Sequence, residues 1–285
     1  MDKAKAFSRI IGLIIILIIM VVSVLIHGIW CNTALETNTY DVDVEDFKGS
    51  LKVAHVSDLH NTEFGKNNQK LIEMLTESEP DIIAITGDIV DGNKTDIQIA
   101  VDFAKQAVKI APCYFVSGNH EYIIDDYDLL KNGLRSAGVT VMQDDFETID
   151  HNGQKITLVG LNDMSVTLAE QTKVDKMYYM MKKKLSDIVP DDADFVILLS
   201  HRPGIINVAC VCDVDVVLSG HTHGGQIRLP FVGGLYVPSQ GFFPDYVEGM
   251  YVKNDTHLIV SRGLGNSVFP LRINNRPELV IVNIK

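Results

Sequence analysis

Short apolar runs alternate with amphipathic stretches through most of the chain. Eight runs have the length and β-branched content of strands, at residues 53–56, 82–86, 113–116, 156–161, 195–199, 214–218, 258–260 and 279–284. Stretches with apolar residues at helical spacing lie between several of them, at 68–77, 97–110, 127–137 and 170–188. Strands that alternate with helices predict an α/β domain with largely buried sheets.

The first 30 residues have a different pattern. No charged residue occurs from 10 to 30, and about 20 apolar residues cross a hydrocarbon core as a helix. Lys3, Lys5 and Arg9 precede this stretch, and acidic residues follow it between 36 and 46. The positive-inside bias then places the N-terminus in the cytoplasm and the rest of the chain outside. We therefore expect a single-pass protein of the cell membrane with an extracytoplasmic domain.

Three parts follow from this pattern: a membrane anchor at 1–30, a linker or edge strand at 31–49, and one domain at 50–285. A cleaved signal peptide is the alternative to the anchor. Such a peptide has a shorter apolar region and small residues before its cleavage site. Cleavage after Ala34 would put Asn32 at the third position before the cut, which is a poor site. These features favour an uncleaved anchor.

Composition and charge narrow the possible functions. The chain has 285 residues, 46% of them hydrophobic, so it can bury a substantial core. Its net charge is −12, with +2 in residues 1–30 and −14 in the remainder. A body this acidic repels a nucleic-acid backbone, so we expect no nucleic-acid partner; a nuclease would need a local basic groove. Four cysteines do not make a disulfide framework in a chain of this size, and Cys210 and Cys212 alternate as strand residues would.

Metal-ligating side chains follow five of the apolar runs. Their endings are Ser57-Asp58-Leu59-His60, Gly87-Asp88, Gly118-Asn119-His120-Glu121, Ser200-His201 and Gly220-His221-Thr222-His223. Ligand sites of open α/β sheets lie at the carboxyl ends of strands, so these side chains can converge. Asp, Asn and His without Cys suit Mn, Fe or Zn, and there are enough ligands for two ions that share a carboxylate. Two such ions can hold a bridging hydroxide and clamp a phosphoryl group.

In order and spacing these endings resemble the five-motif signature of the calcineurin-like metallophosphoesterases, over about residue 50 to the C-terminus. Segments 220–230, 261–265 and 272–278 are similar to the small bacterial membrane-associated branch of that family. This branch includes anchored or secreted phosphodiesterases and is related to lipid pyrophosphohydrolases. The resemblance implies a four-layer αββα sandwich, in which two mixed β-sheets are flanked by helices, here preceded by one N-terminal transmembrane helix.

The resemblance also implies a role for each residue. Two divalent ions (Mn, Zn or Fe) would be held by Asp58, His60, Asp88, Asn119, His201, His221 and His223. The first ion would have Asp58, His60 and His223 as ligands, the second would have Asn119, His201 and His221, and Asp88 would bridge both. His120 would not be a ligand. It would stabilise the phosphoryl charge and protonate the leaving oxygen, because histidine exchanges protons near neutral pH. The expected catalytic residues are thus His120, Asp88 and Asn119.

Three further residues have two interpretations each. Glu121 could orient a site histidine, or it could be a solvated loop carboxylate. Arg202 and Arg262 could bind the substrate phosphate as bidentate donors, or they could be structural.

The sequence thus predicts a metal-dependent phosphoesterase, with a phosphodiester preferred because of the branch resemblance. A site close to the membrane favours a lipid-linked or cell-envelope substrate. A phosphomonoesterase and a lipid pyrophosphohydrolase are alternatives on the same site. The alternative of another class is a non-catalytic metal-binding interaction module. Such a module would be expected to lack ligands or the acid, whereas Asp88, Asn119 and His120 are all present.

Overall fold

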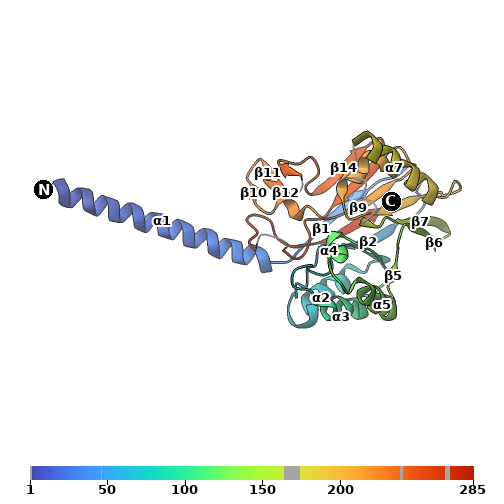
Figure 1. Ribbon diagram of the computed structural model, residues 1–285, viewed down its shortest axis with the longest axis horizontal. Coiled ribbons are helices and arrows are strands. Elements are labelled where there is room, and N and C mark those ends of the chain that lie inside the picture. Colours follow the sequence, from blue (N-terminus) through green and yellow to red (C-terminus); the bar gives the residue numbers. More distant parts are fainter. Residues whose placement is uncertain (1, 46, 164–173, 238–239, 267–269) are drawn as a thin grey trace.

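Two six-stranded sheets stack face to face between layers of helices (Figure 1). The computed structural model describes residues 2–45, 47–163, 174–237, 240–266 and 270–285. Helices α2, α3 and α5 cover the outer face of one sheet, and α7 covers the outer face of the other. The predicted four-layer αββα sandwich of mixed sheets is therefore confirmed.

The first sheet has the order β1-β16-β2-β3-β4-β5. Its strands are β1 (Glu36–Val42), β16 (Glu278–Ile284), β2 (Leu51–Val56), β3 (Ile82–Thr86), β4 (Cys113–Val116) and β5 (Thr140–Val141). Strands β2 to β5 are parallel, and β16 is antiparallel to β2. The edge strand β1 pairs in parallel with β16, from Glu36 opposite Glu278 to Val42 opposite Ile284. The strand that follows the first helix is thereby paired with the last strand of the sheet in sequence, β16.

The second sheet has the order β14-β15-β9-β8-β7-β6. Its strands are β14 (Gly249–Lys253), β15 (Thr256–Val260), β9 (Val216–Ser219), β8 (Val196–Leu199), β7 (Gln154–Gly160) and β6 (Asp145–His151). The four central strands are parallel, and both edge strands are antiparallel to their neighbours. Two short hairpins, β10 (Arg228–Leu229) with β11 (Gly233–Gly234) and β12 (Tyr236–Val237) with β13 (Gly241–Phe242), lie between β9 and β14.

Apolar residues fill three interfaces of the sandwich. Between the sheets, residues such as Val53 and Val116 pack against Leu158 and Leu218. The outer helices are α2 (Gln69–Ser78), α3 (Ile97–Ala107), α5 (Tyr127–Ala137), α7 (Val174–Ile188) and α8 (Ile206–Ala209). Leu75 and Phe103 belong to the cluster on the first sheet, and Leu185 and Ile206 belong to the cluster on the second. Central strands are thus buried on both faces, which explains their continuous apolar runs.

The expected elements lie close to their predicted places, with one clear error. All eight strand runs overlap an observed strand, and the start of the expected helix 170–188 lies outside the described residues. The strand prediction for Cys210 and Cys212 is wrong, because both follow the short helix α8 in a turn. Pro203 begins a helical turn there, and a short apolar run cannot by itself distinguish a buried helix from a strand. All four cysteines are free.

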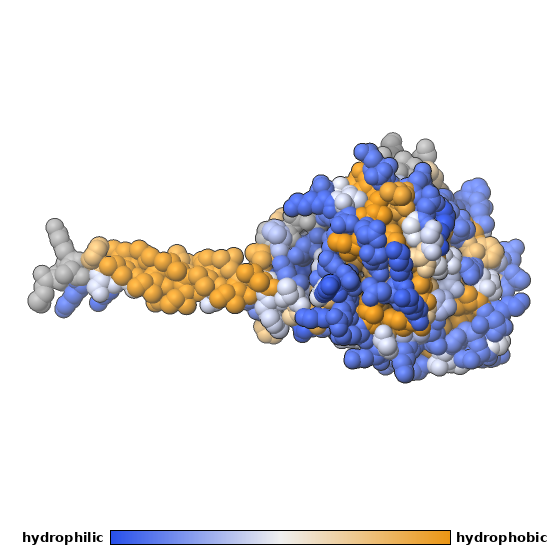
Figure 2. All heavy atoms as spheres, turned by 90° about the horizontal axis from the view of Figure 1, so that it is seen from below, coloured by the Kyte–Doolittle hydropathy of each residue, from blue (hydrophilic) through white to orange (hydrophobic). Residues whose placement is uncertain are grey.

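The N-terminal helix α1 (Asp2–Thr33) projects from the domain as a hydrophobic rod (Figure 2). Its segment from Lys5 to Thr33 is long and apolar enough to cross a membrane, by length and composition. Its last turns contact the domain. Arg276 donates to the carbonyl oxygens of Ala34 and Leu35, and its guanidinium lies 5.2 Å from the centre of the Trp30 ring.

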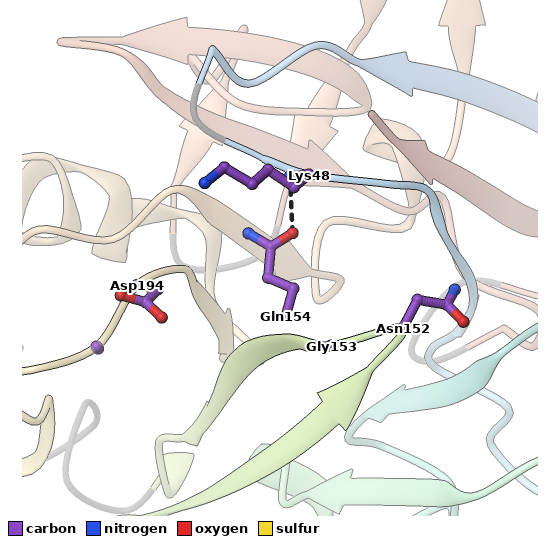
Figure 3. Close-up of a pocket in the computed structure, with 6 residues that line it drawn as sticks. Lys48, Asn152, Gly153, Gln154 and Asp194 are labelled. Atoms are coloured by element: carbon purple, nitrogen blue, oxygen red, sulfur yellow. Dashed lines mark hydrogen bonds between the residues drawn. The ribbon is translucent and has the colours of Figure 1, made fainter.

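A surface hollow of about 630 Å³ lies at the other end of the second sheet from the predicted ligands (Figure 3). It is lined by Lys48, Asn152, Gly153, Gln154, Ala193 and Asp194. The backbone N–H of Lys48 donates to Gln154 Oε1 at 2.7 Å across it. Because Gln154 begins β7, this hollow is at the amino ends of the parallel strands, and none of its lining residues is a predicted ligand.

Candidate metal centre

The predicted ligands come together at the carboxyl ends of β2, β3, β4, β8 and β9. Their ligand atoms form two groups whose members all lie within 4.8 Å of one another: Asp58, His60 and His223, and Asp88, His201 and His221. Within the first group, His60 Nε2 is 3.2 Å from His223 Nε2 and 3.9 Å from Asp58 Oδ1. Within the second group, His201 Nε2 is 3.2 Å from both His221 Nδ1 and Asp88 Oδ2. Segments up to 165 residues apart in the chain thus converge on one site.

Asp88 belongs to the second group and also faces the first. Its Oδ2 is 3.6 Å from His60 Nε2 in the first group and 3.2 Å from His201 Nε2 in the second. The same oxygen is 4.0 Å from His120 Nε2. One carboxylate therefore faces nitrogen atoms of both groups, which is the arrangement that two cations sharing a ligand require.

The chemistry of the donor set fits divalent cations. Burial lowers the pKa of His60 to about 4 and holds the pKa values of His221 and His223 well below their usual range, so these imidazoles are neutral. His201 donates its Nδ1 proton to the carbonyl oxygen of Thr86 at 2.8 Å. Burial lowers the pKa of His201, but the adjacent Asp88 carboxylate outweighs burial and raises it to about 10, so a cation at Nε2 would replace a proton there. Asn119 Oδ1 and His221 Nε2 are buried without a hydrogen-bond partner. Buried polar atoms without a partner are rare, and a bound cation would satisfy them.

His120 is placed beside the ligands by the backbone. It is in the first turn of α4 (Asn119–Ile123), and its ring meets the His60 ring edge-on with the centres 4.5 Å apart. The N–H of Gly92 donates to His120 Nδ1 at 2.9 Å. An Nδ1 that accepts a hydrogen bond leaves the proton of a neutral imidazole on Nε2, which is the atom 4.0 Å from Asp88 Oδ2. The site therefore has an N–H donor directed at the space beside the shared carboxylate.

Comparison with known proteins agrees with this geometry. Residues 51–225 match the sequence profile of the calcineurin-like phosphoesterases. The metallophosphoesterase YkuE of Bacillus subtilis is 31% identical over 240 residues, which cover 82% of this chain and 79% of YkuE.

The chain belongs to the calcineurin-like phosphoesterase family. It is a hydrolase of phosphoric ester bonds. The phosphodiesterase YaeI of Escherichia coli is 28% identical and matches over 84% of each chain. A transmembrane protein with a metallophosphoesterase domain from Danio rerio is 27% identical, covering 95% of this chain and 62% of its own length.

Glu121 supports the backbone of this phosphoesterase site. Its carboxylate is fully buried and accepts N–H bonds from Asp88 at 2.8 Å, Gly118 at 2.6 Å and Ile89 at 2.9 Å. Burial and the Asp88 carboxylate raise the pKa of Glu121 to about 8, and the N–H donors oppose that rise. Both carboxylate oxygens of Glu121 accept backbone N–H bonds, so the geometry matches the ionised carboxylate. Of the two interpretations of Glu121, the solvated loop carboxylate is wrong.

The ligand loops have an unusual backbone. Five of the predicted ligands have positive φ angles between 45° and 71°: Asp58, His60, Asp88, His221 and His223. Such conformations cost free energy for residues with a Cβ, and they persist where surrounding contacts impose them. Gly118 permits the close packing, because a Cβ there would lie 2.2 Å from Asp88 Oδ1.

The two predicted substrate-binding arginines have different surroundings. Arg202 directly follows the ligand His201, and its Nε donates to Asp163 Oδ1 at 2.8 Å. Arg262 is paired with three carboxylates, those of Glu36, Glu248 and Glu278. A substrate phosphate would have to compete with these carboxylates for the Arg262 guanidinium. Arg202 is likewise held by a carboxylate, since its Nη2 also lies 3.4 Å from Asp163 Oδ2.

Two further residues, Asp91 and Arg272, lie at the ligands although the sequence assigned neither of them a role. Asp91 Oδ2 is 4.0 Å from His60 Nδ1, and Asp91 groups with His60 and His120. Arg272 is completely buried, and its Nη2 donates to the backbone oxygens of Arg262 and Gly265 and lies 3.5 Å from His223 Nδ1. The sequence feature that could have identified Asp91 is its position three residues after Asp88, in the same loop after β3.

Proposed function

We propose that this chain is a membrane-anchored phosphodiesterase that works with two divalent cations. The observation that carries the proposal is the position of Asp88 Oδ2, 3.6 Å from a nitrogen of one ligand group and 3.2 Å from a nitrogen of the other. Asp58, His60 and His223 would hold one cation, His201 and His221 the other, and Asp88 both. Asn119, whose Oδ1 is buried without a hydrogen-bond partner, would complete the second set. Bound cations in such a site supply Lewis acidity and lower the pKa of a water molecule.

The residues of the chain would divide the remaining work. Asn119 is a neutral oxygen ligand, so it leaves the site positive enough for an anionic phosphate. His120 would act from Nε2. As a neutral ring, which the Gly92 N–H bond to Nδ1 favours, it would donate an Nε2–H hydrogen bond to the phosphoryl group. To protonate the leaving group it would act as an imidazolium, whose Nε2–H bond breaks as the new O–H bond forms, and it would return to the neutral ring. Arg202 would orient a non-reacting phosphate oxygen, with Asp163 holding the guanidinium in place.

Two features support the choice of substrate. A relative at 28% identity, YaeI, has the name of a phosphodiesterase. The apolar helix α1 is joined to the domain only a few residues from β1, so α1 would hold the site near a bilayer. The basic residues before the apolar stretch and the acidic residues after it support a domain outside the cytoplasm. A phosphodiester that is lipid-linked or part of the cell envelope would be within reach there.

Hydrolysis by the purified full-length chain in lipid nanodiscs tests the catalytic part. A chromogenic phosphodiester and the matching monoester are offered with Mn²⁺, with Zn²⁺ and with a chelator. We expect diester turnover that the chelator abolishes. His120→Ala should lower kcat by about 10²-fold or more, as for loss of a general acid, without lowering the metal content. His151→Ala, at the end of β6 beside the hollow at the amino ends of the parallel strands, is the matched control and should retain full turnover.

Other outcomes would overturn parts of the proposal. Turnover of the monoester alone would keep the site and replace the substrate class. A chain that binds two cations and hydrolyses neither compound would contradict general phosphodiesterase activity, and would favour a narrow substrate or a non-catalytic role. An unchanged kcat in His120→Ala would remove His120 from the mechanism.

A further inference from the structure

We infer that the two short hairpins β10–β13 form a second membrane contact beside helix α1. Large apolar side chains are exposed along these hairpins and their connecting loops. This apolar loop surface consists of Leu229, Phe231, Val232, Tyr236, Phe242 and Phe243, and the Phe231 side chain is fully exposed. The ring centres of Tyr236 and Phe242 are 5.1 Å apart, and those of Phe242 and Phe243 are 6.4 Å apart. Large apolar side chains that are exposed together mark an interaction site rather than ordinary surface. The inference rests on the proposed anchoring by α1.

The apolar loop surface lies next to the domain end of α1. His27 Nε2, in α1, is 2.9 Å from Asn274 Oδ1, and the Asn274 amide donates to the carbonyl oxygen of Arg228, the first residue of β10. The backbone N–H of Arg228 in turn donates to Ile273. In Figure 1 the labels of β10, β11 and β12 lie beside the end of α1. The hairpins are thus two hydrogen bonds away from the helix.

The depth of these contacts indicates a bilayer as the partner. The uncharged stretch of α1 ends at Trp30, and His27 precedes Trp30 by three residues, which is about 4.5 Å along a helix axis. A segment that is level with His27 therefore lies at the boundary between acyl chains and head groups. Aromatic side chains favour this boundary, and interfacial elements bury their apolar side about 5–10 Å deep. The three phenylalanines and Tyr236 of the surface match that environment.

The junction between α1 and the domain prevents the hairpins from swinging away. Gly28 packs so closely on the domain that a Cβ there would lie 3.3 Å from the Leu271 side chain. Asn32 donates to the Pro270 carbonyl and accepts from the N–H of Arg272. Arg276 stacks on Trp30 and forms an ion pair with Glu36 at 2.6 Å. These contacts fix the domain at one orientation to the helix, and so to the membrane.

The same hairpins are attached to the metal centre. Only Gln226 and Ile227 separate β10 from η3 (His223–Gly225), which begins with the ligand His223. Leu235 N–H donates to Ile227, and a Cβ on Gly225 would lie 2.6 Å from the Gly234 backbone. A surface in contact with the leaflet would therefore hold the site at the head-group level. The chemical class of substrate that fits is a phosphodiester whose phosphate is carried by a lipid in that leaflet.

Tryptophan quenching by brominated lipid tests this surface in the full chain. Trp30 is the single tryptophan, so the wild-type chain in phosphatidylcholine vesicles, which add no other protein, reports on α1 alone. Phe231→Trp in a Trp30→Phe background reports on the hairpins. Phe146→Trp in the same background is the matched control, because Phe146 is an exposed aromatic residue on β6, at the end of the domain away from α1 (Figure 1). The quencher is phosphatidylcholine brominated near its head group.

We expect quenching of Trp30 in the wild-type chain and comparable quenching of the tryptophan at 231, with none at 146. If Trp30 is quenched and position 231 behaves like position 146, the second contact is wrong while anchoring by α1 stands. If Trp30 itself is not quenched, the anchoring proposal fails and this inference fails with it. A blue-shifted but unquenched tryptophan at 231 would mean that protein covers the surface, which also overturns the inference. Phosphodiester hydrolysis is measured separately and depends on none of these results.

Discussion

Replacing Glu121 by glutamine tests how the backbone of the metal centre is held. Glu121→Gln keeps the shape of the side chain and removes its charge. The carboxylate accepts three short N–H bonds: Oε2 accepts from Asp88 and Gly118, and Oε1 accepts from Ile89. A glutamine has one acceptor oxygen, so its amide N–H would face at least one backbone N–H. The loops that carry Asp88 and Asn119 would lose part of their common support.

The size of the effect follows from these bonds. A hydrogen bond to a charged acceptor contributes about 1.5–3 kcal/mol, and a buried donor without a partner costs about 1–3 kcal/mol. With its oxygen at the Oε2 position, glutamine keeps two weakened bonds and loses the bond to Ile89. We therefore expect the free energy of unfolding to fall by about 3–5 kcal/mol. Loss of a residue that orients metal ligands typically costs about 10–100-fold in metal affinity or activity.

Two measurements check this prediction. Urea unfolding of the metal-free chain gives the stability, and isothermal titration with Mn²⁺ gives the affinity of each variant. Glu77→Gln, an exposed carboxylate on α2, is the matched control and should change neither quantity measurably. Equal stability and equal metal affinity in wild type and Glu121→Gln would refute the reasoning. That result would mean that Glu121 is protonated in the folded protein, in line with its raised pKa, so that glutamine mimics it.

Three further predictions concern the sheet, a turn and the substrate. Burial lowers the pKa of His55 to about 3, so the unfolded chain binds a proton below pH about 6.5 that the folded chain does not, and stability is lost as pH falls. Between pH 8 and pH 5.5, the free energy of unfolding of the wild type should fall by about 1.4 kcal/mol more than that of His55→Asn. Parallel pH profiles of the two chains in urea unfolding would contradict this. Gly87→Ala should lower the midpoint of thermal unfolding far more than Gly153→Ala. Both glycines have φ near 85°, but only at Gly87 would a Cβ lie 2.3 Å from a backbone nitrogen. Equal shifts of the midpoint would show that φ alone decides the cost. Arg202→Lys should raise KM for the diester about 10-fold with unchanged metal content, since lysine cannot make a bidentate contact, and an unchanged KM would make Arg202 structural.

The sequence by itself determined the layered α/β architecture and the convergence of the ligands within each sheet. Buried parallel strands are continuous apolar runs, and their carboxyl ends meet at one edge of a sheet, so local pattern is enough to place Asp58 beside Asp88. His201 follows β8 of the second sheet and joins them only because the two sheets stack. The apolar stretch of α1 is likewise a local property, since about 20 uncharged residues have few other uses. The short apolar run before Cys210 and Cys212 was too brief for the same reasoning, and there the prediction failed.

Only the tertiary structure decided what each polar side chain faces. Glu121 is a support because backbone N–H groups of the loop after β3, together with that of Gly118 in its own loop, point at it, and no spacing in the sequence encodes the contact with the β3 loop. Arg262 meets carboxylates of β1 and β16, strands that are more than 200 residues apart in the chain and are paired in one sheet. The left-handed backbone at His221 and the contact between His27 of α1 and Asn274 are also products of packing between distant segments. Periodicity and strand ends are local, whereas partners, burial and orientation arise only when the whole chain has folded.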